Sequence, residues 1–234
     1  LAGPDAWVGI PGMSAVVKHM TAEFDVHWSH QVLGLSRNGD GWTIQSTNPV
    51  DKIFDTMILA VPSEQAAALL SLHDLELAKI AAMSRSQPCW TAMFAFDQSL
   101  GDVPVVIRDR DDIAWAARNN AKPGRSGPET LVVQANAAWS RAHLELEQAE
   151  IAAKLWSIFS GALKCDHITP IFAAAHRWRF ALSAGTGDGA LWNADKGLGV
   201  CGDWLLGPRV ECAWLSGREL AGRIRNSEID IQPT

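Results

Sequence analysis

Short alternating and apolar runs, separated by turn residues, fill the first quarter of the chain. The runs on either side of the Asn-Gly-Asp-Gly sequence at 38–41 alternate as strands do, which predicts a hairpin near residues 30–47. An apolar run at 56–61 continues them and must end at the proline that follows. We therefore predict a three-stranded meander that leads into a helix, with Ser63 as the N-cap of that helix.

The rest of the chain forms blocks of helical and strand-like pattern. Helical spacing of apolar residues predicts four helices, and short alternating or apolar runs predict strands, the first of which pair in one antiparallel sheet. The expected helices lie at residues 13–24, 63–85, 145–163 and 211–225, and the expected strands at 88–97, 103–109, 112–119, 130–136, 168–182 and 197–203. This order indicates a mixed α/β (α+β) fold.

Composition and charge narrow the class of protein. The 234 residues carry a net charge of -6 with no long run of either sign, so the basic patch of a nucleic-acid binder is missing. No stretch approaches the roughly 18 apolar residues that cross a bilayer, so we expect no membrane partner and a cytoplasmic location. The four cysteines contain no CxxC pair, which predicts neither a metal site nor a redox dithiol.

Candidate chemistry gathers near the end of the chain. A small-residue strand ends in Gly202 and Asp203, and ligands of open α/β sheets bind beyond the carboxyl ends of such strands. A carboxylate at that position can accept hydrogen bonds from ligand hydroxyl groups. A helix then begins near Val210, and the free N–H groups of its first turn suit an electron-rich oxygen or a developing anion. A Gly-Asp pair alone is more often only a turn, so the specificity lies in this order of features.

The same helix carries small residues at Ala213, Gly217 and Ala221, at intervals of four. Residues four apart lie on one face of a helix, and small side chains allow a close approach. We therefore expect this face to lie against a sheet or a ligand.

This ordered segment resembles the closing flavin motif of the flavin amine oxidase superfamily, and over about residues 7–225 the chain is most similar to its renalase-like branch. In that family the Asp of the Gly-Asp pair contacts the ribityl or phosphate part of FAD, and the next helix points its N-terminus at the flavin N1–C2=O edge. The first strand of the meander supplies a Val on the adenine side. The cofactor-binding residues that the resemblance implies are Val32, Ala60, Pro62, Gly202, Asp203, Arg209, Val210, Glu211 and Cys212.

The catalytic residues stay open between functional and structural interpretations. His176 and Trp178 belong to a segment that lies beside the flavin in the family, yet simple strand alternation explains them equally well. Trp192 and Trp204 are candidates to flank the flavin ring, with core packing as the alternative. The candidates for the chemistry are thus Trp178, Trp192 and His176. The cysteine positions do not match the attachment site of covalent flavin, so the resemblance implies a noncovalent cofactor.

The resemblance also implies a domain organisation of the amine-oxidase-like, FAD/NAD(P)-binding type. It assigns a discontinuous flavin-binding domain to residues 22–62 and 194–226, and an antiparallel-sheet substrate domain to residues 1–21 and 63–193. The Rossmann-like βαβ unit, whose GxGxxG turn holds the FAD pyrophosphate at a helix N-terminus, is missing from the sequence.

The function implied is that of a FAD-dependent oxidoreductase. It would pass a hydride from a dihydronicotinamide-type or amine substrate to the flavin, with oxygen as the acceptor. The alternative is a non-catalytic fragment or subunit that needs a separate nucleotide-binding segment, in which case the chain alone lacks FAD. The expected partners are a small-molecule substrate and either the missing N-terminal segment or a second copy of the chain.

Overall fold

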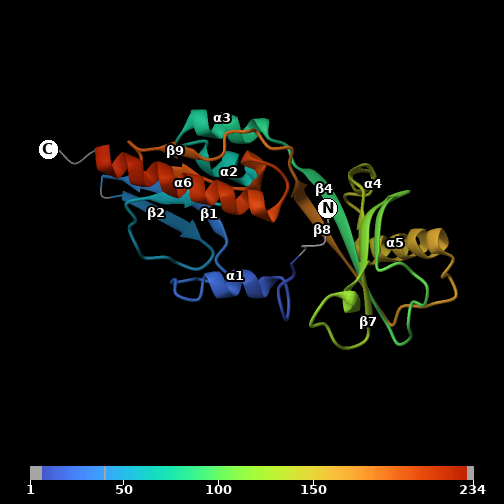
Figure 1. Cartoon of the computed structure of the whole chain (residues 1–234). Coiled ribbons are helices and arrows are strands. Elements are labelled where there is room, and N and C mark those ends of the chain that lie inside the picture. Colours follow the sequence, from blue (N-terminus) through green and yellow to red (C-terminus); the bar gives the residue numbers. More distant parts are fainter. Residues whose placement is uncertain (1–6, 40, 231–234) are drawn as a thin grey trace. The chain divides into compact units, whose positions relative to one another are not determined.

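The computed structural model describes residues 7–39 and 41–230, which form two compact units (Figure 1). Unit 1 comprises Leu1–Val26 and Pro88–Arg179, and unit 2 comprises His27–Gln87 and Phe180–Thr234. Residues 63–87 and 180–193, predicted as part of the substrate domain, fall in unit 2, although Gln87 and residues 180–182 belong to strands of the antiparallel sheet. Residues 22–26, predicted as part of the flavin-binding domain, fall in unit 1. Of the predicted 1–21 segment, residues 1–6 lie outside the described part. Which unit binds flavin and which binds substrate stays a prediction.

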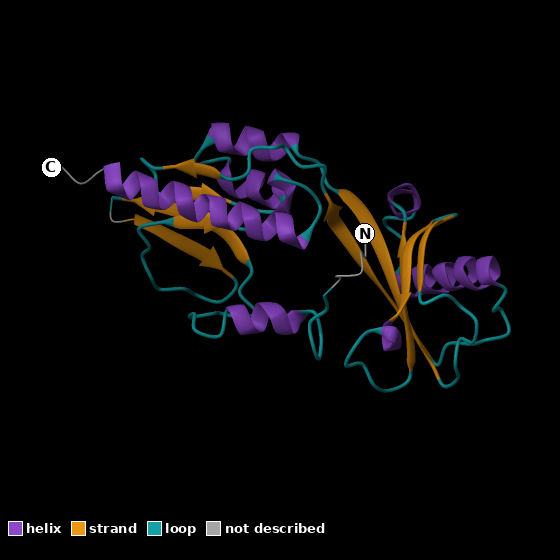
Figure 2. Ribbon diagram, viewed as in Figure 1, coloured by secondary structure: helices purple, strands orange, loops and turns teal. Residues whose placement is uncertain are grey.

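Unit 1 is built on a five-stranded sheet, whose strands are orange in Figure 2. The strand order is β5-β6-β7-β4-β8. The pairs β5–β6, β6–β7 and β7–β4 are antiparallel, which confirms the predicted antiparallel sheet. The strands are β4 (Gln87–Phe96), β5 (Val106–Arg110), β6 (Ile113–Arg118), β7 (Glu129–Ala135) and β8 (Phe172–Leu182).

The predicted amphipathic helix covers one face of this sheet. Helix α5 (Gln148–Leu163) buries Ile151, Leu155 and Phe159 in a cluster that includes Phe94 of β4. Apolar residues spaced by three or four positions therefore packed as predicted. Unit 1 also contains α1 (Ser14–Met20), the 3₁₀ helix η1 (Asn119–Ala121) and α4 (Ala137–Ala142).

Unit 2 contains the predicted hairpin and a separate small sheet. Strands β1 (Val32–Asn38) and β2 (Gly41–Ser46) pair antiparallel, and residue 40 of their turn lies outside the described residues. The predicted three-stranded meander is wrong, because β3 (Met57–Leu59) does not pair with β2; among the described residues, only the bridge between Trp42 and Phe54 extends the hairpin. Strand β3 instead pairs parallel with β10 (Leu198–Val200), whose other neighbour is the antiparallel β9 (Leu191–Asn193).

The helix predicted at 63–85 is two helices, α2 (Ser63–Leu70) and α3 (Leu75–Met83). Asp74 begins the second one as its N-cap, since its side chain accepts a hydrogen bond from the N–H of Leu77. Ser63 is not an N-cap, which corrects the prediction: Pro62 takes that position, and the Ser63 hydroxyl donates to the carbonyl of Ser84 (3.0 Å).

The small sheet lies between α2 and α3 on one face and α6 (Val210–Asp230) on the other (Figure 1). Leu198 and Val200 belong to the apolar cluster that α2 and α3 complete. Gly199 points to the opposite face, where a Cβ would lie 3.0 Å from Leu220 of α6. This glycine therefore permits the close approach of α6.

Helix α6 packs through a different face from the one predicted. Cys212, Ser216 and Leu220 are its buried residues among those described, whereas Ala213 and Ala221 are exposed and nothing lies within 4 Å of a Cβ at Gly217. The small-residue face is therefore not the sheet contact, because the helix packs through the face of Cys212, Ser216 and Leu220; the other predicted contact of the small-residue face, a ligand, stays a prediction. No helix in the described ranges is long and apolar enough to cross a membrane.

Candidate cofactor-binding site

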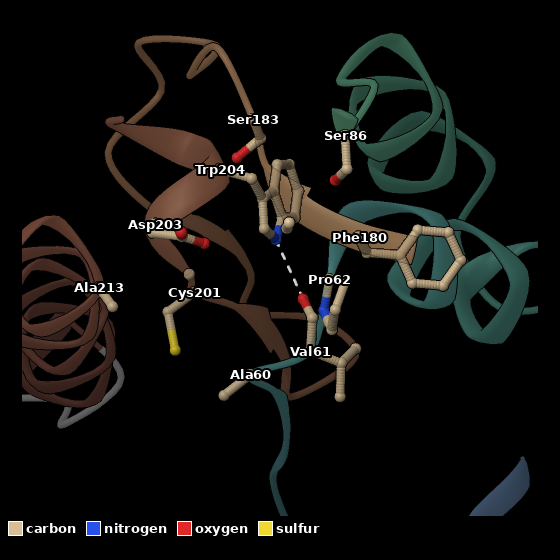
Figure 3. A pocket seen from close by; sticks show the side chains of 12 residues that line it. Ala60, Val61, Pro62, Ser86, Phe180, Ser183, Cys201, Asp203, Trp204 and Ala213 are labelled. Carbon is tan, nitrogen blue, oxygen red and sulfur yellow. Dashed lines mark hydrogen bonds between the residues drawn. The ribbon is translucent and has the colours of Figure 1, made fainter. Parts of the chain in front are cut away.

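A cavity of about 220 Å³ lies in unit 2, beyond the carboxyl ends of β3 and β10 (Figure 3). These two strands are parallel, so both chains leave the sheet at the same edge, where ligands of α/β sheets bind. Five segments contribute the lining, which consists of Ala60, Val61, Pro62, Ser86, Phe180, Ala181, Ser183, Cys201, Gly202, Asp203, Trp204 and Ala213.

Asp203 begins the short 3₁₀ helix η2 (Asp203–Leu205) directly after β10. Its carbonyl oxygen accepts hydrogen bonds from the N–H groups of Leu206 (2.9 Å) and Gly207 (2.6 Å), which fix its main chain. Its carboxylate has no hydrogen-bond or ion-pair partner among the described residues, and Figure 3 shows it on the side of the cavity where Ala213 lies. The side chain is therefore available to accept hydrogen bonds from a ligand.

Trp204 links the ends of β3 and β10, the two strands that border the cavity. Its indole is 1% exposed, and its Nε1–H donates to the carbonyl of Val61 at 3.0 Å, the dashed line of Figure 3. A Cβ at Gly202 would lie 2.9 Å from this indole, so the glycine leaves the space that the ring occupies. The Gly-Asp pair is thus tied to the end of β3 through one buried tryptophan.

The first turn of α6 has free N–H groups, as predicted for a helix N-terminus. The first bond of the helical type runs from the N–H of Ala213 to the carbonyl of Arg209 (3.2 Å), and the N–H groups of residues 210–212 have no backbone acceptor within the described part. Arg209 and Glu211 form an exposed ion pair at 3.8 Å, which contributes little stability.

The structure brings four of the nine predicted cofactor residues to the cavity, namely Ala60, Pro62, Gly202 and Asp203. Val32, at the start of β1, is exposed and does not line it, and Arg209, Val210, Glu211 and Cys212 precede the lining residue Ala213 on the chain. The residues that sequence reasoning missed include Ser86, Phe180, Ser183 and Cys201. Only Cys201 had a signal in the sequence, because it directly precedes the Gly-Asp pair.

The three catalytic candidates belong to different units. His176 and Trp178 are exposed neighbours on β8 of unit 1, with ring centroids 4.4 Å apart in an edge-to-face arrangement. Trp192 lies in unit 2 on β9, half-buried, and its Nε1–H donates to the hydroxyl of Ser227 (3.1 Å). Trp192 does not line the cavity. The described residues also hold no group of three or more His, Cys, Asp or Glu side chains that could bind a metal ion.

A family model for flavin containing amine oxidoreductases matches residues 2–225. The chain belongs to this family. The match includes the Gly-Asp turn, the residues that line the cavity and the first turns of α6.

Solved structures with the same fold include three oxidases. A cyclohexylamine oxidase from Brevibacterium oxydans IH-35A has a TM-score of 0.66 and 14% identity, with 94% of this chain and 53% of that one covered. A redesigned putrescine oxidase has a TM-score of 0.67 and 12% identity (92% and 52% covered). A putative protoporphyrinogen oxidase from Exiguobacterium sp. 255-15 has a TM-score of 0.64 and 14% identity (92% and 51% covered). The chain thus spans about half the length of these proteins.

Proposed function

We propose that this chain forms part of a noncovalent FAD site in an oxidoreductase that takes a hydride from its substrate. The observation that carries the proposal is the carboxylate of Asp203, which has no partner among the described residues and lies in a cavity at the carboxyl ends of two parallel strands. Carboxylates at this edge bind the hydroxyl groups of nucleotide cofactors, and the ribityl chain of FAD is rich in such hydroxyls. When bound, FAD supplies the hydride acceptor, with molecular oxygen as the proposed final oxidant.

The dimensions and the chemistry of the cavity fit a part of FAD. At about 220 Å³ it is smaller than the roughly 300–1,000 Å³ of pockets that enclose a drug-sized ligand, so it holds one portion of the cofactor. Ala60 and Ala213 contribute only small side chains to the wall of the cavity, and the Asp203 carboxylate provides a hydrogen-bond acceptor. The free N–H groups at residues 210–212 stabilise negative charge on a ligand at the start of α6.

The proposed substrate is a dihydronicotinamide, with amines as the second class. The resemblance to the renalase-like branch supports this order. We expect a dihydronicotinamide isomer to bleach the flavin absorbance of the loaded protein under anaerobic conditions. Bleaching by amines alone would contradict the proposed order.

Replacing Asp203 with alanine is expected to weaken FAD binding about 10- to 100-fold, because charge-assisted hydrogen bonds to ligand hydroxyls are lost. Fluorescence titration of FAD with the purified protein measures this change. Asp195→Ala is the matched control, since Asp195 is an exposed carboxylate in the turn between β9 and β10, away from the cavity lining. Equal affinities of Asp203→Ala and the wild type would refute the assigned role.

Cys201 offers an independent probe of the cavity. It is half-buried and lines the cavity, whereas Cys89, Cys165 and Cys212 are buried. Burial raises the pKa of the Cys201 thiol, so the reactive thiolate is scarce at neutral pH. We expect the Cys201 thiol to be alkylated slowly, and faster as the pH rises toward that pKa. Bound FAD should slow the alkylation further, and peptide mass spectrometry can measure both effects. An alkylation rate indifferent to FAD would place the cofactor elsewhere.

A second proposal is that the chain binds FAD only together with a separate nucleotide-binding segment. The observation that favours it is the position of β3 at the edge of its sheet. The N–H and C=O groups of Met57 and Leu59 point toward β10, so those of Ile58 point toward the open edge of the sheet. Ile58 is also 46% exposed. An added strand can pair there.

Titration of the purified chain with FAD separates the two proposals. Uptake by the chain alone supports the first. If FAD binds only after co-expression with a βαβ segment from a family member, the second holds. Ile58→Pro should then abolish complementation, since it removes the edge N–H while sparing the bonds to β10. Complementation that survives Ile58→Pro would contradict pairing at β3.

A further inference from the structure

Ser216 is a fully buried hydroxyl in the middle of the α6 face that packs on the rest of unit 2. Its exposure is 0%, and a buried hydroxyl is costly unless it forms hydrogen bonds. Ser216 forms two of them. Its Oγ–H donates to the carbonyl of Gly189 (2.6 Å), and its oxygen accepts from the N–H of Gly202 (3.0 Å). Since a carbonyl can only accept and an N–H can only donate, both directions are fixed.

These two bonds join α6 to the turn that carries Asp203. Gly202 directly precedes Asp203, so the bond from its N–H fixes the peptide that leads into the carboxylate-bearing residue. Asp203 is held on its other side by Leu206 and Gly207, whose N–H groups bond to its carbonyl. The turn is therefore anchored at both ends, and Ser216 provides the anchor from the helix.

The bond from Ser216 to the Gly189 carbonyl reaches the glycine-rich loop at 185–189, and this loop in turn forms hydrogen bonds with η2. The N–H of Thr186 donates to the carbonyl of Trp204 (3.1 Å), and the N–H of Gly187 donates to that of Leu205 (2.9 Å). Gly189 has a φ of +72°, a conformation that favours glycine, and its carbonyl ends the loop at Ser216. One hydroxyl thus links α6, the Gly-Asp turn and the loop that supports it.

We propose that Ser216 is a positioning residue of the candidate flavin site, which orients Asp203 for the ligand through the N–H of Gly202. The inference rests on the proposed function and adds a residue that does not itself line the cavity. Ala213, three residues earlier on α6, does line it, so the same helix supplies part of the wall and the anchor of the turn.

The test is Ser216→Ala, with Ser140→Ala as the matched control. Ser140 is also 0% exposed on a helix and accepts a hydrogen bond from a strand N–H, that of Trp90 (3.0 Å), but it belongs to unit 1. Both variants should lower the melting temperature. Only Ser216→Ala should weaken FAD binding, by about 10-fold, while Ser140→Ala stays within about twofold of the wild type. Equal Kd values for the two variants would reduce Ser216 to a structural residue and overturn the proposal.

A double-mutant cycle shows whether Ser216 acts through Asp203. In the Asp203→Ala background, the added Ser216→Ala should change the FAD affinity by less than about twofold, because the group that it positions is gone. Additive losses would contradict a positioning role.

Amide hydrogen exchange without cofactor gives a readout that needs no FAD. In Ser216→Ala the N–H of Gly202 loses its acceptor and should exchange at least about 10-fold faster, while the amides of β4 keep their rates. Unchanged exchange at Gly202 would overturn the proposal even if the affinity falls. If the wild type binds no FAD, the proposed function of the chain alone fails, and the exchange rate still decides whether Ser216 holds the turn.

Discussion

Trp204→Ala is expected to lower the free energy of unfolding by about 3–5 kcal/mol, the largest effect of a single substitution that we predict. The indole is 1% exposed, so its removal leaves a large cavity in the core of unit 2. It also removes the donor to the carbonyl of Val61, the link between the ends of β3 and β10. We therefore expect loss of FAD binding as well. Urea denaturation followed by circular dichroism measures the stability.

Trp214→Ala is the control for this substitution. Trp214 lies on α6 in the same unit but is 49% exposed, with the Arg218 guanidinium 4.7 Å from its ring centroid. We expect a loss below about 1 kcal/mol, as is usual for surface positions. Trp204→Phe should fall between the two, since it keeps an aromatic ring and leaves the Val61 carbonyl without its donor. A loss for Trp204→Ala no larger than that for Trp214→Ala would show that the link is unimportant.

Elements with strong local patterns were predictable from the sequence. The α5 face with Ile151, Leu155 and Phe159 repeats at helical spacing, and the hairpin around 38–41 has a turn sequence that favours only one kind of structure. Both are confirmed, as is the antiparallel sheet of unit 1. For the helix and the hairpin, neighbours along the chain supply most of the information, whereas β4 of the sheet pairs with β7, about 40 residues later.

Pairing between distant segments was not predictable in the same way. Strand β3 follows the hairpin along the chain, which favours a meander, yet it pairs with β10, about 140 residues later. Met57 and Leu59 are buried with α2 and α3, and this burial is available only beside β10. A strand of only three apolar residues contains no sequence signal that identifies its partner strand.

The site was predictable where one segment contains it and not where several converge. Gly202 and Asp203 stand in a recognisable order before α6, and the structure places them at the cavity. Ser86 and Ser183 reach the same cavity from segments without any motif. Ser216 was hidden for another reason: a helix face was judged by its small residues, while the actual contact uses a hydroxyl whose two partners lie at positions 189 and 202.

Asp74→Ala is expected to cost about 2–4 kcal/mol of stability, because the carboxylate combines a helix cap with a partly buried ion pair. Asp74 is 6% exposed and accepts at Oδ1 from the N–H of Leu77 (3.1 Å). Its Oδ2 accepts from the amide of Asn193 (2.7 Å) and the ammonium of Lys196 (3.2 Å). The aspartate thereby joins the start of α3 to the turn between β9 and β10, on which the position of β10 depends.

This carboxylate also predicts a pH dependence of stability. Burial alone would raise the pKa of Asp74, but the hydrogen bonds from Leu77, Asn193 and Lys196 outweigh it and hold that pKa below its ordinary value. The folded state thus binds the proton less tightly than the unfolded chain, so the stabilisation is complete above about pH 4 and is lost as the pH falls through the folded pKa. Asp74→Asn keeps a cap without the charge.

The stability difference between the wild type and Asp74→Asn should therefore be constant near neutral pH and shrink below about pH 4, as urea titrations at several pH values can show. Asp195→Asn, at the exposed turn residue beside Lys196, should leave the wild-type profile unchanged. A difference that stays the same down to the lowest pH at which the protein folds would mean that the Asp74 charge contributes nothing. The loss in Asp74→Ala would then come from the cap and the packing alone.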